Sequence, residues 1–165
     1  SNAGWDLQTT LERQTKERID VLNYYKHLIR TVAEVESLTN KSWKFPEYPE
    51  LQRKIKEKSE AFNVALPSYD YLVYLSHHGF PSPLLDWTES PYIAAYFAYI
   101  TATTQNPAIY CFIERPEGVK GGIGGEPRIT LKGPFIKTHI RHFAQKAWYT
   151  ISTQWDYNQK AHYFC

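Results

Sequence analysis

Residues 76–99, SHHGFPSPLLDWTESPYIAAYFAY, decide the fold that the sequence predicts. Gly79 is typical of a helix that ends in the left-handed conformation, and the helix it ends is expected to start at Ser68. Ser90 and Pro91 are typical of a helix start, because serine caps free amides and proline at the first helical position loses no donor. The charge-free helix that follows is apolar on almost every side, so we expect it to be buried.

The residues before this stretch predict two further helices. Residues 10–38 carry apolar side chains at helical spacing with charged residues between them, which predicts one long amphipathic helix. A second helix is expected to start near Pro49, with Leu51, Ile55 and Phe62 on its apolar face. Its basic face we interpret as a solvated surface.

The pattern changes after Pro107, where short runs rich in β-branched and aromatic residues replace the helical period. Residues 108–113 predict a central strand. Further strands are expected at Arg128–Leu131, Phe135–His139 and Ala147–Ile151. The sequence therefore predicts an α+β fold, with a helical first half followed by a small, mostly antiparallel sheet.

Length and composition bound the class of protein. The 165 residues predict one domain over residues 4–165, incomplete at one or both ends, after a tag remnant at residues 1–3. A net charge of +2 argues against nucleic-acid binding, and two cysteines fit a reducing cytoplasm. The uncharged run 90–113 is interrupted by polar residues and proline, so we expect a soluble protein without a membrane span.

The histidines do not predict a metal site. His77 and His78 are adjacent, so on a helix they point about 100° apart and cannot chelate one ion together. His139 and His142 lie three apart without a further cluster at ligand spacing. We expect one of the first two histidines to face a pocket or interface and the other to cap the end of its helix.

Asp86 is unusual because it is an acidic residue in an apolar part of the sequence. It stands between Leu85 and Trp87, and an unpaired carboxylate in apolar surroundings is costly. Three readings stay open: the carboxylate pairs with a cation, it accepts amides in the turn before Ser90, or it faces a polar site. Further along the chain, Arg141 and Gln145 share a face and could line the same cleft.

These residues resemble those of the FRG domain family. The run His77-x-Gly-x-Pro-x-x-Leu-Leu-Asp-Trp-Thr88 is similar to the family's Gln-His-Tyr-Gly-Leu-Pro-Thr-Arg-Leu-Leu-Asp-Trp-Thr. Residues 5–13 and 141–150 resemble two other family segments. The chain differs at Ser76, Pro83 and Ala147, where the family has Gln, Arg and Gly, and its Phe/Tyr-Arg-Gly motif would precede Trp5.

The resemblance implies a function related to ADP-ribosyltransferases, whose order of strands and helix is similar. NAD would then be the substrate of a bacterial, cytoplasmic toxin or defence effector, with a protein as acceptor. An open alternative is a non-catalytic binding module with the same fold, and the oligomeric state stays open. The implied catalytic residues are Asp86, Thr88 and Gln145, and the implied NAD-binding residues are His77, Trp87, Arg141 and Tyr149.

Overall fold

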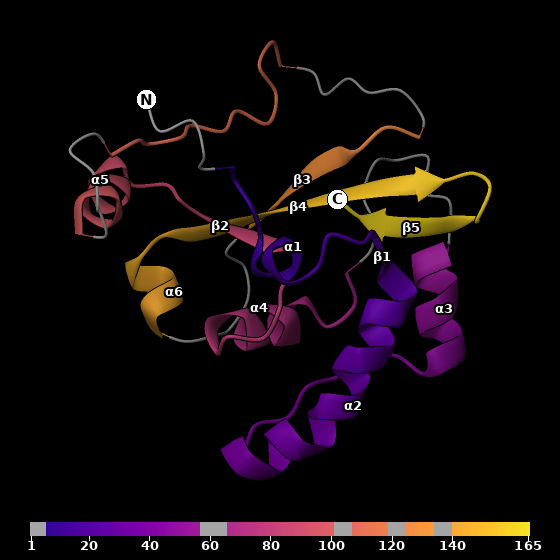
Figure 1. The fold of residues 1–165 in the computed structure, drawn as a ribbon. Helices are drawn as coiled ribbons and strands as arrows, with labels where there is room; N and C mark the ends of the chain where they lie inside the picture. The colour runs from indigo at the N-terminus through magenta and orange to yellow at the C-terminus, as the bar shows by residue number, and fades with distance from the viewer. Residues whose placement is uncertain (1–5, 57–65, 101–106, 119–124, 134–139) are drawn as a thin grey trace.

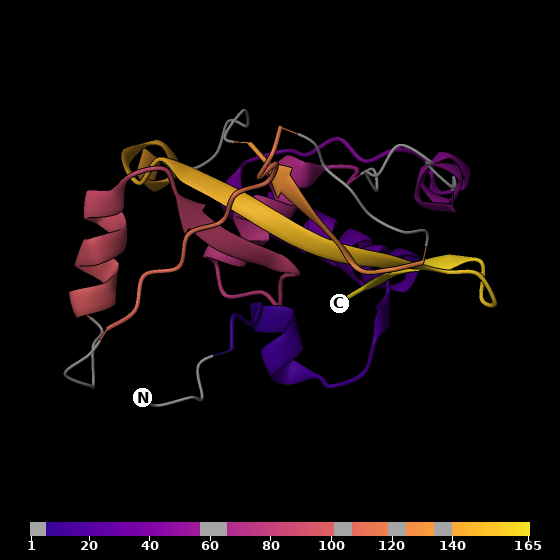
Figure 2. The same ribbon diagram turned by 90° about the horizontal axis from the view of Figure 1, so that it is seen from above.

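The computed structural model describes residues 6–56, 66–100, 107–118, 125–133 and 140–165 (Figure 1). Helices dominate the first half of the chain, and most of the sheet comes from the second half. Helices α2 and α4 lie against one side of the sheet, whereas α5 stands at its edge (Figures 1 and 2). The predicted α+β fold is therefore confirmed. The predicted strand at 135–139, Phe62 and residues 1–3 lie outside the described residues.

The sheet is built around one long strand near the end of the chain. Strand β4 (Ala147–Asp156) pairs with β3 (Arg128–Lys132) along one edge. Its other edge pairs first with β2 (Leu84–Thr88) and then with β5 (Ala161–Phe164), which lie end to end. Strand β1 (Ile19–Asp20) completes the sheet beside β5, and every pairing is antiparallel. Two predicted strands, at 128–131 and 147–151, are confirmed as β3 and the first half of β4.

The predicted single helix over residues 10–38 is wrong. Helix α1 (Thr10–Gln14) is short and starts in a capping box between Thr9 and Glu12. The chain then extends so that β1 can pair with β5, a long-range interaction that local periodicity does not reveal. Helix α2 (Val21–Thr39) begins only after Asp20, whose carboxylate accepts the amide proton of Asn23 at 2.7 Å.

Helices α3 (Tyr48–Lys56) and α4 (Tyr69–His77) agree with their predicted places. Gly79 adopts the left-handed conformation with a φ of 84° just after α4, as expected. Ser68 precedes α4 but makes no side-chain cap, because its hydroxyl donates to the carbonyl of Lys44 at 2.6 Å. The core gathers between α2, α3, α4 and the sheet; its most deeply buried members are Val21, Tyr25, Leu28, Leu51, Tyr71, Leu72, Val73 and Tyr149.

The turn between α4 and β2 is tied to the N-terminal helices. The hydroxyl of Tyr24 donates to the carbonyl of Pro81 at 2.6 Å, and the amide of Ser82 donates to the hydroxyl of Thr10 at 2.8 Å. Ser82 is fully buried, and Pro83 is buried as well. These contacts fix where β2 enters the sheet, and β2 carries Asp86.

Two predictions fail in the same part of the molecule. Helix α5 (Pro91–Ile100) begins where Ser90 and Pro91 predict, but it has no buried residue. Residues 108–113, predicted as a central strand, pair with none of the five described strands. Their Phe112 ring instead contacts Trp87, with ring centroids 5.7 Å apart. Both stretches are apolar, but apolar composition does not specify which surface will cover a segment.

The last described helix is α6 (Ile140–Ala144), which leads directly into β4. Among the described helices, none is both long enough and apolar enough to cross a membrane.

Candidate functional site

The register between β2 and β4 decides which predicted site residues share a face. Asp86 lies opposite Tyr149 and Thr88 lies opposite Ala147, so their side chains point to the same side of the sheet. Trp87 lies opposite Trp148 and points to the other side. The structure therefore brings Asp86, Thr88 and Tyr149 together and separates Trp87 from them.

Tyr149 joins two histidines from different helices. Its hydroxyl lies 3.0 Å from Nε2 of His77, the last residue of α4, and 3.0 Å from Nδ1 of His142 in α6. Tyr149 and His142 are completely buried, whereas His77 is exposed. We call these three residues the His-Tyr-His cluster. It forms a continuous polar path from the protein interior to solvent.

One hydroxyl proton cannot satisfy two acceptors. Tyr149 can donate to one imidazole only and must accept an N–H from the other. The ring of His142 stacks on Tyr149 at 5.7 Å with an interplanar angle of 11°, and Tyr69 meets Tyr149 edge to face at 6.2 Å. Packing thus holds the central ring in place, and the orientation of the exposed His77 depends on the buried pair behind it.

Asp86 lies beside this cluster in a partly shielded position. Its side chain is exposed, yet desolvation by the surrounding protein raises its pKa above the ordinary value. The carboxylate therefore contacts solvent but lies close enough to the surrounding protein to lose part of its hydration. Burial raises the pKa of Tyr149 and of Tyr69, and the nearby Asp86 carboxylate contributes in the same direction. Both phenols therefore stay protonated next to the acid.

Thr88 and Gln145 are linked through the backbone. The Thr88 hydroxyl donates to the carbonyl of Gln145 at 2.7 Å and accepts from the amide of Ser90 at 3.1 Å. The amide of Glu89 also donates to the carbonyl of Lys146 at 3.1 Å. These bonds hold the half-buried Gln145 at the end of the β2–β4 pair, where α6 passes into β4. Both hydrogen bonds of the Thr88 hydroxyl are thus made to the protein backbone.

The two remaining candidates are Trp87 and Arg141. The indole N–H of Trp87 donates to the Thr150 hydroxyl at 2.8 Å, on the face away from Asp86. Arg141 lies in α6 beside His142, but its side chain is outside what the structure describes. Within the described ranges, no three side chains of the His, Cys, Asp or Glu type gather as a metal site would require.

Of the two roles expected for the adjacent histidines, the cap at the end of the helix is confirmed for His78. His77 reaches the cluster, whereas the ring Nδ1 of His78 lies 2.7 Å from the Tyr74 carbonyl at the end of α4. The sequence does not predict the part of His142 in this cluster, because its spacing to His139 bears only on metal binding. Its signal in the sequence was weak, because a histidine in a five-residue helix carries no periodic pattern.

Comparison with known proteins identifies one family. The family model described as FRG domain matches residues 1–107, which is more than half of the chain. His77, Asp86, Trp87 and Thr88 fall within the match, whereas Gln145 and Tyr149 lie beyond it. No curated protein matches the chain, and no solved structure does.

Proposed function

This chain belongs to the FRG domain family, and on that premise we propose that it binds NAD beside Asp86 and transfers the ADP-ribose group. One observation carries the proposal. Titratable side chains from α4 and α6 converge on Tyr149 of β4, next to a carboxylate with a raised pKa. A packed sheet face ordinarily holds apolar side chains, and a group of perturbed titratable residues there is a mark of a functional site.

The proposed reaction breaks the bond between C1′ of the ribose and the ring nitrogen of nicotinamide. The electron pair of that bond stays with the nitrogen, so neutral nicotinamide leaves and the ribose becomes oxocarbenium-like. Water or a nucleophile on an acceptor protein then attacks C1′ and loses its proton. The Asp86 carboxylate is suited to stabilise the positive charge that develops on the ribose.

Each of the other residues has a distinct part in this proposal. His77 is exposed and donates or accepts a hydrogen bond at a ribose hydroxyl. Tyr149 and His142 are buried, so they act as positioning residues that fix the His77 ring. Thr88 likewise positions Gln145. Trp87 faces away from Asp86 and Tyr149 is buried, so neither stacks on a nicotinamide held beside Asp86.

The test is nicotinamide release from NAD, followed by chromatography, with the wild-type chain. Asp86→Asn is expected to lower the rate by about 100-fold or more, in the range found when one charge-stabilising group is removed. Glu50→Gln, which changes an exposed carboxylate in α3, should keep the wild-type rate. Equal rates for Asp86→Asn and wild type would contradict the proposed role of the acid.

A non-catalytic binding module is the second candidate. The buried Pro83 stands where the family carries an arginine, and a set of aromatic side chains on α5 is exposed. Calorimetry with NAD separates the two candidates. Binding without nicotinamide release favours the module, and the absence of both binding and release removes the NAD proposal. In either case we propose a cytoplasmic protein, in which Cys111 and Cys165 remain free thiols.

A further inference from the structure

Helix α5 presents an aromatic surface to solvent. It consists of Tyr92, Tyr96, Phe97, Tyr99 and Ile100, which are all exposed. Tyr92 is 85% exposed and Tyr99 is 69% exposed, values expected of charged rather than aromatic side chains. Tyr92, Tyr96 and Tyr99 follow the helical spacing i, i+4, i+7, so they form one stripe. Phe97 and Ile100 widen this stripe into a face.

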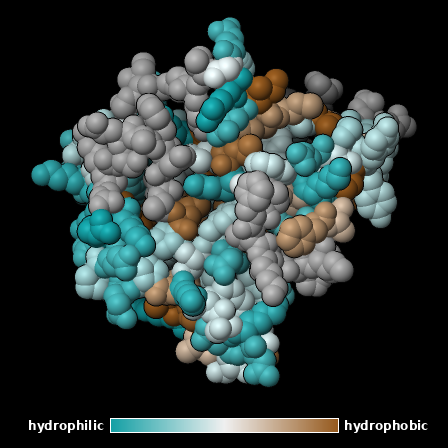
Figure 3. Space-filling model, turned by 180° about the vertical axis from the view of Figure 1, so that it is seen from behind, coloured by the Kyte–Doolittle hydropathy of each residue, from teal (hydrophilic) through white to brown (hydrophobic). Residues whose placement is uncertain are grey.

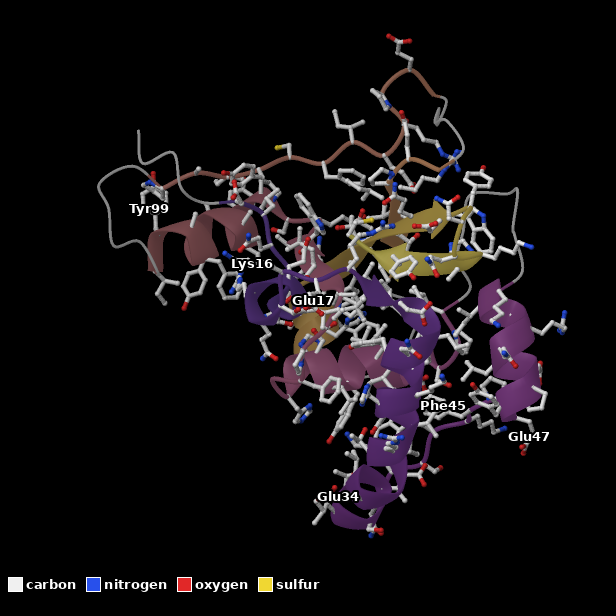
Figure 4. All side chains as sticks on the ribbon, turned by 45° about the vertical axis from the view of Figure 1, so that its right-hand side comes forward. Lys16, Glu17, Glu34, Phe45, Glu47 and Tyr99 are labelled. Carbon is white, nitrogen blue, oxygen red and sulfur yellow. The ribbon has the colours of Figure 1, made fainter. Side chains whose placement is uncertain are left out.

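The placement of α5 makes this surface accessible. Figures 1 and 2 show α5 standing away from the layer of α2, α3 and α4. Tyr99 lies at the outer end of α5, away from the core (Figure 4). Seen from behind, brown and pale side chains gather on the side of the molecule where α5 lies (Figure 3).

The segment that returns from α5 toward β3 extends the apolar area. Residues 107–113 start near the far end of α5 (Figures 1 and 2), and Ile109, Tyr110 and Ile113 are exposed along it. No charged residue occurs anywhere between positions 90 and 113. The surface therefore offers apolar contact and tyrosine hydroxyls but no ionic recognition.

The aromatic surface of α5 is as large as the largest apolar patches that monomers ordinarily expose. A fully buried aromatic side chain covers about 150–250 Å², so the exposed parts of the four aromatic side chains on α5 amount to on the order of 500 Å², and Ile100 adds to this area. The largest apolar patch on a typical monomer is about 300–600 Å². A stable protein interface buries about 800 Å² on each partner.

We propose that the aromatic surface of α5 is the contact between two copies of this chain. The area exposed on α5 is a large part of what one partner buries in a stable dimer. A neutral surface can face its own copy across a two-fold axis without placing like charges together. Recognition of a different protein usually uses complementary charge, and helices that lie on membranes usually carry Lys or Arg on their polar face. Helix α5 carries neither. The tyrosine hydroxyls fit the rim of such an interface, where they can contact water.

Sedimentation of the full chain over a wide range of concentration tests the proposal. The wild-type protein is expected to show twice the 19.3 kDa mass of one chain and to dissociate on dilution. Tyr96→Glu puts two like charges near the middle of the interface and should weaken the dimer by about 100-fold or more. Because Tyr96 is exposed, the variant should keep the wild-type circular dichroism spectrum and remain folded.

Leu38→Glu is the matched control. Leu38 is 78% exposed but lies at the end of α2, away from α5. This variant should sediment like the wild type, so a loss of the dimer in both variants would overturn the assignment of the surface. A wild-type protein that is monomeric at every concentration would also overturn it. So would a monomer that binds vesicles of neutral lipid, because the surface would then contact a membrane.

Discussion

Helices α4 and α5 have opposite relations between composition and burial. Helix α4 contains Asp70, Ser76 and His77, yet Tyr71, Leu72, Val73 and Leu75 are buried in the core. Helix α5 contains no charged residue and ten largely apolar side chains, yet none of them is buried. The helix with the more apolar composition is thus the one on the surface.

The neighbours of each helix explain the difference. Helix α4 lies against the sheet face that also receives α2, so its apolar side chains find partners such as Trp43 and Phe45. Helix α5 starts two residues after the end of β2, and the bond of Thr88 to Gln145 holds the end of β2 at the edge of the sheet. Burial of a helix therefore depends on where its first residue is held, as well as on its own pattern.

The largest expected effect is on stability, and it distinguishes a buried tyrosine of α4 from an exposed tyrosine of α5. Tyr71→Ala in α4 should lower the free energy of unfolding by about 3–5 kcal/mol, because it empties a fully buried aromatic site. Tyr96→Ala in α5 should change it by no more than about 0.5 kcal/mol in dilute protein, where any dimer has dissociated. Urea denaturation measures both. Similar losses for the two variants would mean that α5 is buried in solution.

The next prediction concerns the His-Tyr-His cluster that α4 and α6 make with β4. Tyr149→Phe removes the hydroxyl between two imidazoles and leaves the ring, so it should cost about 1–3 kcal/mol of unfolding free energy. Tyr48→Phe, at an exposed position of α3, serves as the control and should cost less than about 0.5 kcal/mol. NMR of the histidine ring nitrogens should also show a changed tautomer balance at His77 in Tyr149→Phe alone.

A smaller effect is expected from the acid next to the cluster, and it should depend on pH. A raised pKa means that the unfolded chain loses the Asp86 proton at a lower pH than the folded protein. The free energy of unfolding therefore falls as the pH rises through this interval, from about 4 upward. In Asp86→Asn the free energy of unfolding does not fall in this way, because asparagine does not ionise.

At neutral pH, Asp86→Asn should accordingly be more stable than wild type, by no more than about 1 kcal/mol because water screens an exposed carboxylate. The advantage should disappear in acid, where Asp86 is protonated in both states. Urea denaturation at several pH values measures the difference. An advantage that is the same at every pH would show that the carboxylate is not the cause.

The smallest effect belongs to the start of α5. The Ser90 hydroxyl accepts the amide proton of Ile93 at 3.4 Å, a long and weak cap. Ser90→Ala should therefore cost about 0.5 kcal/mol, the low end for such caps. Since α5 has no buried residue, the loss should appear as faster amide hydrogen exchange within α5 while α4 remains protected.

Local signals in the sequence predicted the ends of these helices well. Gly79 and Ser90-Pro91 act through their own backbone conformation, so neighbouring residues suffice to interpret them. The interpretation failed where distant partners decide. Ile19 leaves a helical pattern to pair with Phe164, and residues 108–113 find no strand partner among the described ones.

The residues of the candidate site also differ in whether local sequence or distant partners determine their roles. His77 and Asp86 can be recognised from the sequence because a polar side chain among apolar neighbours is costly to bury without a partner. Neighbouring residues are enough to show this. The role of His142 depends on Tyr149 and His77, and no spacing in the sequence connects these three. The opposite orientation of Trp87 follows from strand alternation, but only once residues 84–88 are known to pair with β4 as a strand.

The position of β4 near the end of the chain has a consequence for synthesis on the ribosome. Residues 1–107 contain β1 and β2, but the strands they pair with occupy residues 147–164. A nascent chain that ends at residue 107 therefore exposes the apolar sides of α2 and α4 and the backbone edges of two strands without partners. We expect such an intermediate to need protection from aggregation until the last strands emerge. We therefore expect the two strands in the portion matched by the family model to become ordered only once residues 147–164 are available.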